Sequence, residues 1–326
     1  MSFFLQNLKK RGHLDKIQMT ICNVGSRKLV DKDDYGSQEW QIFAPQLSIY
    51  GFDADADVCD GANTELETRQ INWTEKHIPL VLSNSVGEST LYVTKNPMCS
   101  SLYPPNESYL ARFYQLAEVA SLDFMVEIET TTLDEFCQSE KIDEIDFLQI
   151  DVQGAELNVL EGASHILEKS VLALQIEVWF SDIYINQPLF AEVDQYIRKQ
   201  GFTFFNLRGG FRHHISSPIV SQSFYGQFLW GDAFYFRDLI RDDRNPNMNN
   251  PEKILKLACI ADLLDFPDYA LELLEYLTLK YGNNPDYNMA NSIIDSLAQI
   301  PELVEHGLSS LPIVAKLRDY IILPYN

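Results

Sequence analysis

The segment Asp146–Leu160, with the sequence DFLQIDVQGAELNVL, places a carboxylate where an apolar strand gives way to a helix. The apolar run Phe147–Ile150 ends at Asp151, and Gln153 and Gly154 then turn the chain into an amphipathic helix. In doubly wound α/β proteins, side chains at the carboxyl end of a buried parallel strand project into the crevice where ligands bind. Asp151 is therefore a candidate to contact a ligand or to accept a proton as a catalytic base.

Two further positions with possible chemistry follow predicted strands near the start of the chain. The strand Leu47–Phe52 ends in Asp53, whose carboxylate can accept hydrogen bonds from both hydroxyls of a ribose. The strand Ile17–Val24 is followed by Gly25, and glycine allows the backbone to approach a ligand closely, although a simple turn is the alternative. The acidic run that begins at Asp53 lacks the glycine and glutamate of an EF-hand calcium loop, and no compact ligand spacing elsewhere demands a metal, so we predict no metal-binding residue.

The first 240 residues alternate between strands and helices, which predicts an α/β fold with a parallel, doubly wound, Rossmann-like sheet. Further strands are expected at Ile78–Leu82, Ser89–Thr94, Met125–Thr130, Leu172–Val178, Phe202–Leu207 and Gln227–Phe236, the second of them as part of a hairpin excursion. Helices are expected at Asp60–Gln70, Thr132–Ser139, Ala155–Glu168 and Leu189–Gln200.

His213 lies in the polar loop Arg208–Gln222, between the last two predicted strands. Imidazole titrates near neutral pH, so His213 is a second candidate for the base that takes a proton from a hydroxyl. A solvated surface histidine is the alternative interpretation of the same position.

The chain changes character after residue 240. Residues 241–251 are polar, with two prolines and four asparagines, and are predicted to link a main domain, 1–240, to a helical region, 252–326. Three helical patterns in that region, Glu252–Asp265, Asp268–Tyr281 and Asp286–Leu297, each begin just after a proline. We expect a C-terminal helical appendage packed on the main domain, with a short helical-repeat array as the alternative.

The composition limits the partners and the setting of the protein. With 47 Asp and Glu against 25 Lys and Arg, the net charge is −22, which disfavours a nucleic-acid partner. The five cysteines are widely spread and form no CxxC pair, which favours reduced thiols in a cytoplasmic setting. We expect no signal peptide, membrane span or membrane partner, because no apolar run is long enough.

The segment around Asp151 resembles the central signature of the FkbM family of S-adenosylmethionine-dependent methyltransferases. In that family an aspartate, an aromatic and apolar residues precede Asp-Val-Glu/Gln-Gly-x-Glu. Asn96–Leu102 (NPMCSSL) resembles the family's Asn-Pro-x-x-Ser-Ser-Leu loop, and Thr131–Phe136 and Ile176–Val178 are further matches. Together the matches cover roughly Ser83–Leu207.

The chain departs from the family pattern at the first strand. Asn23 takes the place of the usual aspartate, and Gly25 is followed by Arg27–Val30 in place of small residues. The resemblance still implies that Asn23 and Gly25 contact the cofactor, S-adenosylmethionine. The departure also motivates a second hypothesis, a non-catalytic methyltransferase-like domain that binds a glycan or a partner protein.

The resemblance implies methyl transfer to a hydroxyl group of a small molecule or a glycan. Asp53 would bind the ribose of the cofactor, and Ser100, Ser101 and Asp151 would line the site, with Asp151 and His213 as candidate catalytic residues. A protein partner or self-association through the helical tail is a further expectation. A nicotinamide-dependent dehydrogenase would carry Gly-x-Gly-x-x-Gly after the first strand, where this chain has NVGSRKLV.

Overall fold

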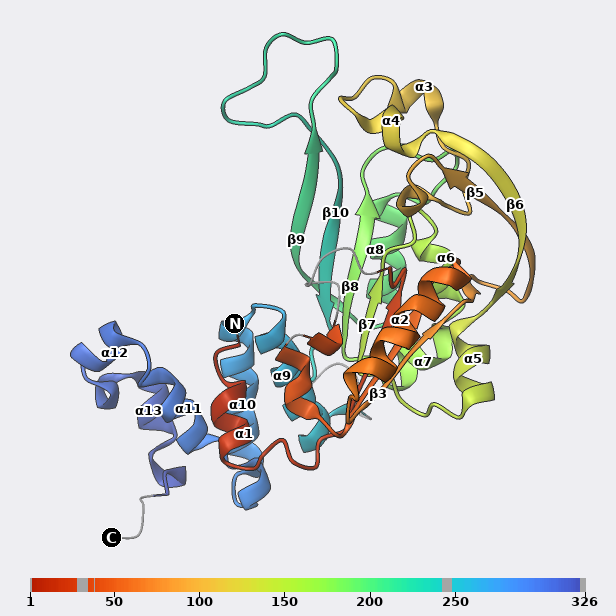
Figure 1. Ribbon diagram of the computed structural model, residues 1–326. Helices are drawn as coiled ribbons and strands as arrows, with labels where there is room; N and C mark the ends of the chain where they lie inside the picture. Colours follow the sequence, from red (N-terminus) through yellow and green to blue (C-terminus); the bar gives the residue numbers. More distant parts are fainter. Residues whose placement is uncertain (1, 28–34, 38, 242–247, 323–326) are drawn as a thin grey trace.

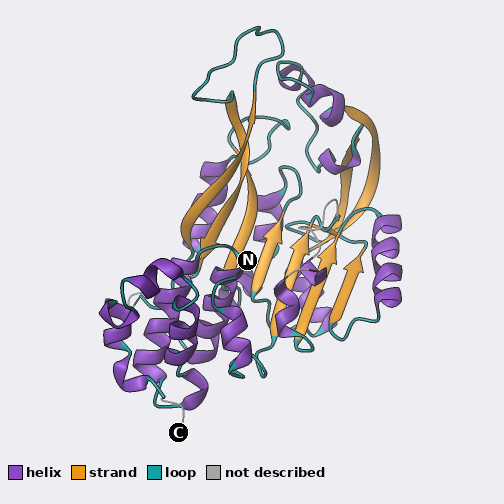
Figure 2. Ribbon diagram, turned by 60° about the vertical axis from the view of Figure 1, so that its left-hand side comes forward, coloured by secondary structure: helices purple, strands orange, loops and turns teal. Residues whose placement is uncertain are grey.

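The computed structural model describes residues 2–27, 35–37, 39–241 and 248–322. A seven-stranded sheet forms its centre, in the order β3-β2-β1-β7-β8-β10-β9 (Figures 1 and 2). Its strands are β1 (Met19–Val24), β2 (Leu47–Phe52), β3 (Thr74–Ile78), β7 (Phe147–Ile150), β8 (Ala173–Trp179), β9 (Thr203–Arg212) and β10 (Gln227–Phe236). The first five are parallel, and β10 is antiparallel to both of its neighbours.

The strand order changes direction between β1 and β7, because the chain builds outward to β3 on one side and to β9 on the other. Such a switch point leaves a crevice at the carboxyl ends of the central strands. The predicted doubly wound, Rossmann-like sheet is confirmed, as are all of its predicted strands except one.

That exception is the strand predicted at Ile78–Leu82. β3 ends at Ile78, and Val81 and Leu82 form β4, which belongs to a separate three-stranded sheet with the order β4-β6-β5. Pro79 lies between them and has no N–H group to continue the ladder. In this second sheet β5 (Gly87–Thr94) pairs antiparallel with β6 (Leu122–Thr131). The hairpin excursion predicted at Ser89–Thr94 is wrong, because α3 and α4 lie between β5 and β6 in the chain, and β4 pairs with β6 instead of with β5.

Four helices cover one face of the large sheet: α5 (Leu133–Glu140), α6 (Glu156–Glu161), α7 (Ser164–Lys169) and α8 (Phe190–Lys199). Their apolar side chains form one core with those of β7 and β8, including Leu148, Ile176, Val159 and Ile197. The single helix predicted at Ala155–Glu168 is wrong, because the chain breaks at Gly162. A Cβ there would overlap the carbonyl oxygen of Ser83, so the close approach of that segment requires glycine.

The helical tail and the start of the chain pack together at the amino ends of the strands. The tail contains α9 (Pro251–Leu263), α10 (Pro267–Tyr281), α11 (Ala290–Leu297), α12 (Pro301–Glu305) and α13 (Pro312–Lys316). With α1 (Leu5–Lys10) these helices share a core that includes Met19, Leu47 and Phe147, which begin β1, β2 and β7. The tail therefore lies at the end of the sheet opposite the crevice.

Side-chain caps fix where several helices begin. Asp55 accepts hydrogen bonds from backbone N–H groups at the start of α2 (Ala56–Arg69), and Thr132 does the same for α5. Asn250 caps α9, and Pro251 follows it at the first helical position. The remaining elements are α3 (Glu107–Leu110), α4 (Leu116–Ala120) and the 3₁₀ helices η2 (Tyr35–Ser37), η3 (Glu39–Phe43), η4 (Pro97–Cys99), η6 (Pro285–Tyr287), η7 (Leu308–Ser310) and η8 (Arg318–Tyr320).

A buried ion pair joins the tail to the sheet. Lys256 on α9 lies 3.0 Å from the carboxylate of Asp146, which also accepts a hydrogen bond from the backbone N–H of Thr20. The first aspartate of the Asp146–Leu160 motif thus has a structural role, far from the crevice. The division of the chain at 240 and 251 remains a proposal, since residues 242–247 of the predicted linker lie outside the described residues.

A second carboxylate of the tail, that of Asp262, holds the start of α1. It is buried and accepts hydrogen bonds from the backbone N–H groups of Phe3, Phe4 and Leu5 at 2.7–3.1 Å. Replacing Asp262 by asparagine removes the charge and one acceptor oxygen, so we expect the free energy of unfolding to fall by about 1–2 kcal/mol in urea titrations. Asp265→Asn, at an exposed position just after the end of α9, should change it by less than about 0.5 kcal/mol.

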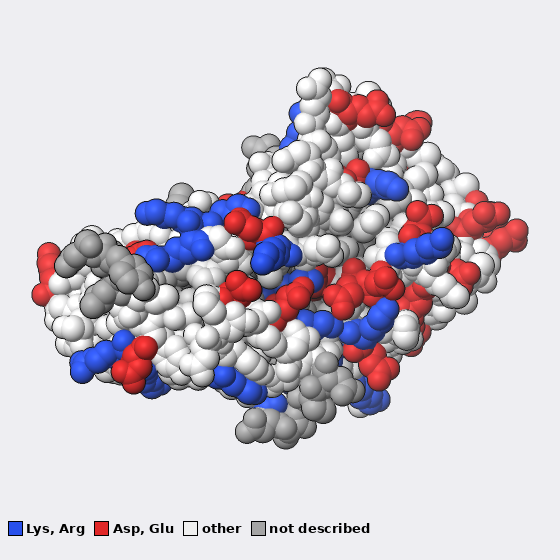
Figure 3. All heavy atoms as spheres, turned by 90° about the horizontal axis from the view of Figure 1, so that it is seen from below, with Lys and Arg blue, Asp and Glu red and all other residues white. Residues whose placement is uncertain are grey.

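One face of the molecule carries both acidic and basic side chains. On the face seen from below, acidic side chains lie beside basic ones and are not gathered into a single patch (Figure 3). Within the described residues, no helix has both the length and the apolar character needed to cross a membrane.

Candidate cofactor and active site

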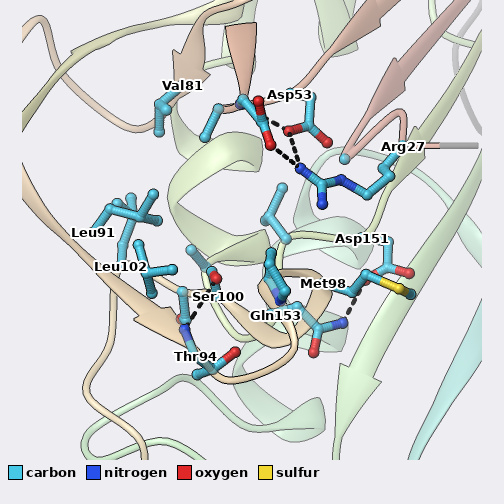
Figure 4. Close-up of a pocket in the computed structure, with 18 of the residues that line it drawn as sticks. Arg27, Asp53, Val81, Leu91, Thr94, Met98, Ser100, Leu102, Asp151 and Gln153 are labelled. Carbon is cyan, nitrogen blue, oxygen red and sulfur yellow. Dashed lines mark hydrogen bonds and ion pairs between the residues drawn. The ribbon is translucent and has the colours of Figure 1, made fainter. Parts of the chain in front are cut away.

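A cavity of about 460 Å³ opens at the carboxyl ends of β1, β2 and β7, beside the smaller sheet (Figure 4). Five of the residues selected from the sequence line it: Gly25, Asp53, Ser100, Ser101 and Asp151. Its size falls within the range of small-molecule sites. The topology thus brings together residues that lie far apart in the chain, such as Asp53 and Asp151, as expected for the crevice of a doubly wound sheet.

Asp53 follows β2 and lies at one end of the cavity (Figure 4). Its Oδ1 accepts a hydrogen bond from the backbone N–H of Asp55 at 2.9 Å and lies 3.8 Å from the guanidinium of Arg27. Among the described residues, no donor contacts its Oδ2. Burial raises the pKa of Asp53, while the Asp55 N–H and the charge of Arg27 oppose that rise. The carboxylate is therefore half satisfied and can accept further hydrogen bonds from a ligand.

Arg27 is a cavity residue that the sequence analysis did not select. Its guanidinium lies 2.5 Å from Asp55 and also faces Asp53, so it keeps two carboxylates close together at the cavity wall. Its position two residues after Gly25 is the sequence feature that could have indicated a place in the cavity wall. The structure describes the chain up to Arg27 at this point, and resumes at residue 35.

Gly25 sits where the ends of three strands meet. Its N–H donates to the carbonyl of Phe52 at 2.9 Å, and the N–H of Asp151 donates to the carbonyl of Val24 at 2.9 Å. Gly25 has φ +86°, and a Cβ there would overlap the carbonyl oxygen of Asp151. The close approach that requires glycine is therefore to the main chain at Asp151, in addition to any ligand in the cavity.

Asn23 does not line the cavity. It is 5% exposed, and its Oδ1 has no hydrogen-bond partner among the described residues. Alternation along β1 turns Asn23 to the same face as Met19 and Ile21, which belong to the core beneath the sheet. The geometry thus gives no support to the predicted contact between Asn23 and the cofactor.

The two serines of the predicted ligand loop shape that loop with their hydroxyl oxygens. Ser100 Oγ accepts the N–H of Thr94 at 3.2 Å, and Ser101 Oγ accepts the N–H of Tyr103 at 3.0 Å. Both serines also line the cavity, with Ser101 buried. A role in turn formation is thus established by hydrogen bonds, and a contact with a ligand remains a prediction.

Gln153 connects two carboxylates at the end of β7 and β8. Its Nε2 donates to Asp151 Oδ1 and to Glu177 Oε2, both at 2.8 Å, and its Oε1 lies 3.0 Å from the hydroxyl of Tyr184, which donates to it. Gln153 and Gly154 both have positive φ, at +55° and +101°. This tight turn aims the Gln153 amide back at Asp151, so it fixes the orientation of the candidate catalytic carboxylate.

Glu156 is held by the backbone of the same turn. Its Oε1 accepts the N–H groups of Val152 and Gly154 at 3.1 and 3.0 Å. Burial raises the pKa of Glu156 to about 7 and also raises that of Glu177, with the nearby charge of Asp151 acting in the same direction. These contacts support a role for Glu156 in stabilising the start of α6.

Asp151, Glu156 and Glu177 each have an oxygen atom within 4.8 Å of the others, a grouping that can hold a metal ion. Hydrogen-bond donors from Gln153 and from the turn already point at these oxygens. The cluster is therefore satisfied without a cation, and it does not by itself indicate a metal.

The raised pKa of Glu177 has a consequence for stability. An unfolded glutamate titrates near pH 4.3, whereas folded Glu177 keeps its proton to higher pH. The folded state then binds more protons, so the free energy of unfolding falls as pH rises above that value. Glu177→Gln removes this dependence, and its stability relative to wild type should rise by about 1 kcal/mol or more between pH 5 and 7. Urea unfolding of the variant and the wild type at both pH values measures this change in relative stability.

Glu88→Gln, at an exposed position, is the control and should show no such change with pH. If Glu177→Gln differs from wild type by the same free energy of unfolding at both pH values, the pKa of Glu177 is not raised.

His213 lies away from the cavity. Its ring stacks on Tyr114, with centroids 5.0 Å apart, and its carbonyl accepts the N–H of Tyr114. It is not among the residues that line the cavity. The position of His213 thus supports a structural contact between the β9–β10 loop and the connection between α3 and α4, and gives no support to its predicted role as base.

The comparisons with known proteins agree with this geometry. Residues 48–204 match the family model of the methyltransferase FkbM domain. A methyltransferase FkbM from Methylobacillus flagellatus KT is 13% identical over 68% of this chain and 43% of that one, with a TM-score of 0.38. No curated protein matches the chain.

Two other solved structures are similar at the same low level. The magnesium protoporphyrin IX methyltransferase (ChlM) of Synechocystis PCC 6803, with bound S-adenosylmethionine, is 12% identical over 72% of this chain and 76% of that one, with a TM-score of 0.33. TrmK of M. capricolum, in complex with S-adenosylhomocysteine, is 12% identical over 98% and 97% of the two chains, with a TM-score of 0.35. Such values carry no argument about function.

The resemblance to the FkbM family rests instead on the match to the family model. The match begins at the second residue of β2 and ends within β9, so it contains Asp53, Ser100, Ser101 and Asp151 but not Gly25 or His213. The family's cofactor is S-adenosylmethionine, and the resemblance inferred from the sequence motifs is confirmed. Residues 48–204 of this chain thus match the FkbM methyltransferase domain.

Proposed function

We propose that the protein transfers a methyl group from S-adenosylmethionine to a hydroxyl group of a small molecule or a glycan. One observation carries the proposal: Asp53 and Asp151 line a single cavity at the point where the strand order changes direction. Both residues lie in the segment that matches the FkbM domain.

The residues of the cavity suit the parts of this cofactor. Asp53 has an oxygen without a donor among the described residues, which suits the two ribose hydroxyls. Leu80, Val81 and Leu82 form an apolar part of the wall that suits a flat, weakly polar base. Gly25 would face the methionine end. When bound, the cofactor supplies an activated methyl on a sulfonium, and the chain positions it.

Asp151 is our candidate for the group that accepts the proton of the acceptor hydroxyl. It lines the cavity, and Gln153 holds one of its oxygens at 2.8 Å, which fixes the carboxylate. Asp151 would take the proton of the acceptor hydroxyl as that oxygen bonds to the methyl carbon, whose bond to the sulfonium sulfur would break. The carboxylate would thus become neutral, and S-adenosylhomocysteine would leave as a neutral thioether, so charge and atoms balance. His213 has no part in this scheme, because its ring stacks on Tyr114 outside the cavity.

The test is calorimetric titration of the protein with S-adenosylhomocysteine, followed by transfer of labelled methyl from S-adenosylmethionine to hydroxylated acceptors. We expect saturable binding and acceptor-dependent transfer. Absence of binding by the folded protein would overturn the proposal. The altered glycine turn after β1 would then explain why no cofactor binds, and a non-catalytic methyltransferase-like binding domain would be the better hypothesis.

A further inference from the structure

The β9–β10 hairpin ends in a loop that projects beyond the neighbouring elements (Figures 1 and 2). Every residue from Ile215 to Tyr225 is exposed, and the loop is rich in large apolar and aromatic side chains. Ile219 is 80% exposed, and Phe224 and Tyr225 are each 73% exposed. Apolar side chains gathered at such a projecting site indicate a surface that is covered by a partner.

The charge of this hairpin is opposite to that of the chain as a whole. No Asp or Glu occurs between Asp194 and Asp232, although the chain contains 47 acidic residues. Arg212 lies at the base of the loop, with its guanidinium 4.7 Å from the ring centroid of Trp230. Neither Arg212 nor neighbouring Arg112 pairs with a carboxylate of a described residue. The loop thus has apolar side chains at its tip and arginine side chains near its start.

Contacts with the α3–α4 segment hold the base of the loop in place. His214 stacks on Phe113 with ring centroids 4.9 Å apart, and the N–H of Ile215 donates to the carbonyl of Arg112 at 3.0 Å. An isolated β-bridge pairs Phe113 with His214. These contacts therefore fix the position of the arginine side chains relative to the apolar tip of the loop.

We propose that this loop docks the protein on a lipid bilayer that carries anionic headgroups. Ile219, Phe224 and Tyr225 would enter the interfacial region, where aromatic and apolar side chains are favoured. Arg112 and Arg212 would meet the headgroup phosphates. The remainder of the chain is strongly acidic and is repelled by the same surface, so the charges also set the orientation. Lack of carboxylates in the loop favours a lipid surface over a basic protein partner.

The strand directions place this loop on the same edge of the sheet as the cavity. β10 is antiparallel to both β8 and β9, so β9 runs parallel to β8 and its carboxyl end, Arg212, leads into the loop. The cavity lies at the carboxyl ends of β1, β2 and β7. A bilayer bound at the loop would therefore face the edge that contains the candidate active site. This proposal differs from the sequence-based expectation of no membrane partner.

The experiment is co-sedimentation of the full chain with vesicles of equal parts phosphatidylcholine and phosphatidylglycerol, and with vesicles of phosphatidylcholine alone. We expect binding to the anionic vesicles that weakens with added salt. The double variant Phe224→Ser and Tyr225→Ser should bind about tenfold more weakly, because it loses the buried apolar area. Arg212→Gln should reduce binding to the anionic vesicles alone.

The control is Val86→Ser with Val304→Ser, which removes apolar side chains that are 68% and 49% exposed at other places on the surface. It should bind vesicles as the wild type does. Wild-type protein that stays in solution with both vesicles, or a Phe224/Tyr225 variant that binds unchanged, overturns the proposal. A wild-type dimer in solution that this variant dissociates, without vesicle binding, assigns the loop to a second copy instead. None of these outcomes depends on methyl transfer.

Discussion

Asp53→Ala should weaken the binding of S-adenosylhomocysteine by about 1–3 kcal/mol, which is roughly 5- to 150-fold in Kd. The carboxylate lies in the cavity wall with one oxygen bonded to the N–H of Asp55 and the other without a described donor. If it accepts the ribose hydroxyls, its removal leaves two buried donors of the cofactor unpaired. Calorimetry of the folded variant measures the loss.

A neighbouring carboxylate provides the matched control. Asp57 is exposed at the start of α2 and lies outside the cavity, so Asp57→Ala should bind S-adenosylhomocysteine as the wild type does. Asp55 is unsuitable, because it caps α2 and pairs with Arg27. Equal affinity in wild type and Asp53→Ala, with both proteins folded, would remove Asp53 from the cofactor site while leaving the fold assignment untouched.

The second large effect is expected for Gly25→Ala. The residue has a positive φ, and the new Cβ would overlap the carbonyl oxygen of Asp151, which is backbone and cannot rotate away. Left-handed strain and the overlap together should lower the free energy of unfolding by about 2–4 kcal/mol. Because relief of the overlap must shift the main chain at Asp151, affinity for S-adenosylhomocysteine should fall by about tenfold or more.

Gly61 is the matched control for this substitution. It lies within α2, and a Cβ there would meet nothing within 4 Å. Gly61→Ala should therefore stabilise the protein, by up to about 1 kcal/mol, because alanine favours helix over glycine. Unfolding in urea and calorimetric titration of both variants make the comparison. A Gly25→Ala protein as stable as wild type would show that the ends of β1 and β7 are further apart than described.

Local pattern was sufficient to find the edge of the sheet at which the cavity lies. Apolar runs ending in Asp53 and Asp151 predict strands with a carboxylate at the end, and parallel strands expose those ends on one side. Gly25 directly follows the first strand, so it is predicted to lie at the same edge. These inferences hold because strand formation and strand direction follow from short apolar runs separated by helices.

The errors of the sequence analysis arise where a contact between distant segments determines the local structure. The helix predicted through Gly162 breaks because that glycine packs against the backbone of Ser83. The roles expected for Asn23 and His213 stay predictions that the packing does not support, because Asn23 faces the core beneath the sheet and His213 stacks on Tyr114. Residue type suggested a role for both, whereas the direction of each side chain follows from the packing.

The sequence by itself determined the family, the α/β alternation, the helical tail and the two carboxylates of the cavity, because these depend on motifs and on periodicity within short segments. Only the tertiary structure decided that Gln153 joins Asp151 to Glu177, and that Asp146 pairs with Lys256, 110 residues further along. Hydrogen bonds and ion pairs of this kind depend on how separate elements pack, and no local pattern of residues specifies that packing.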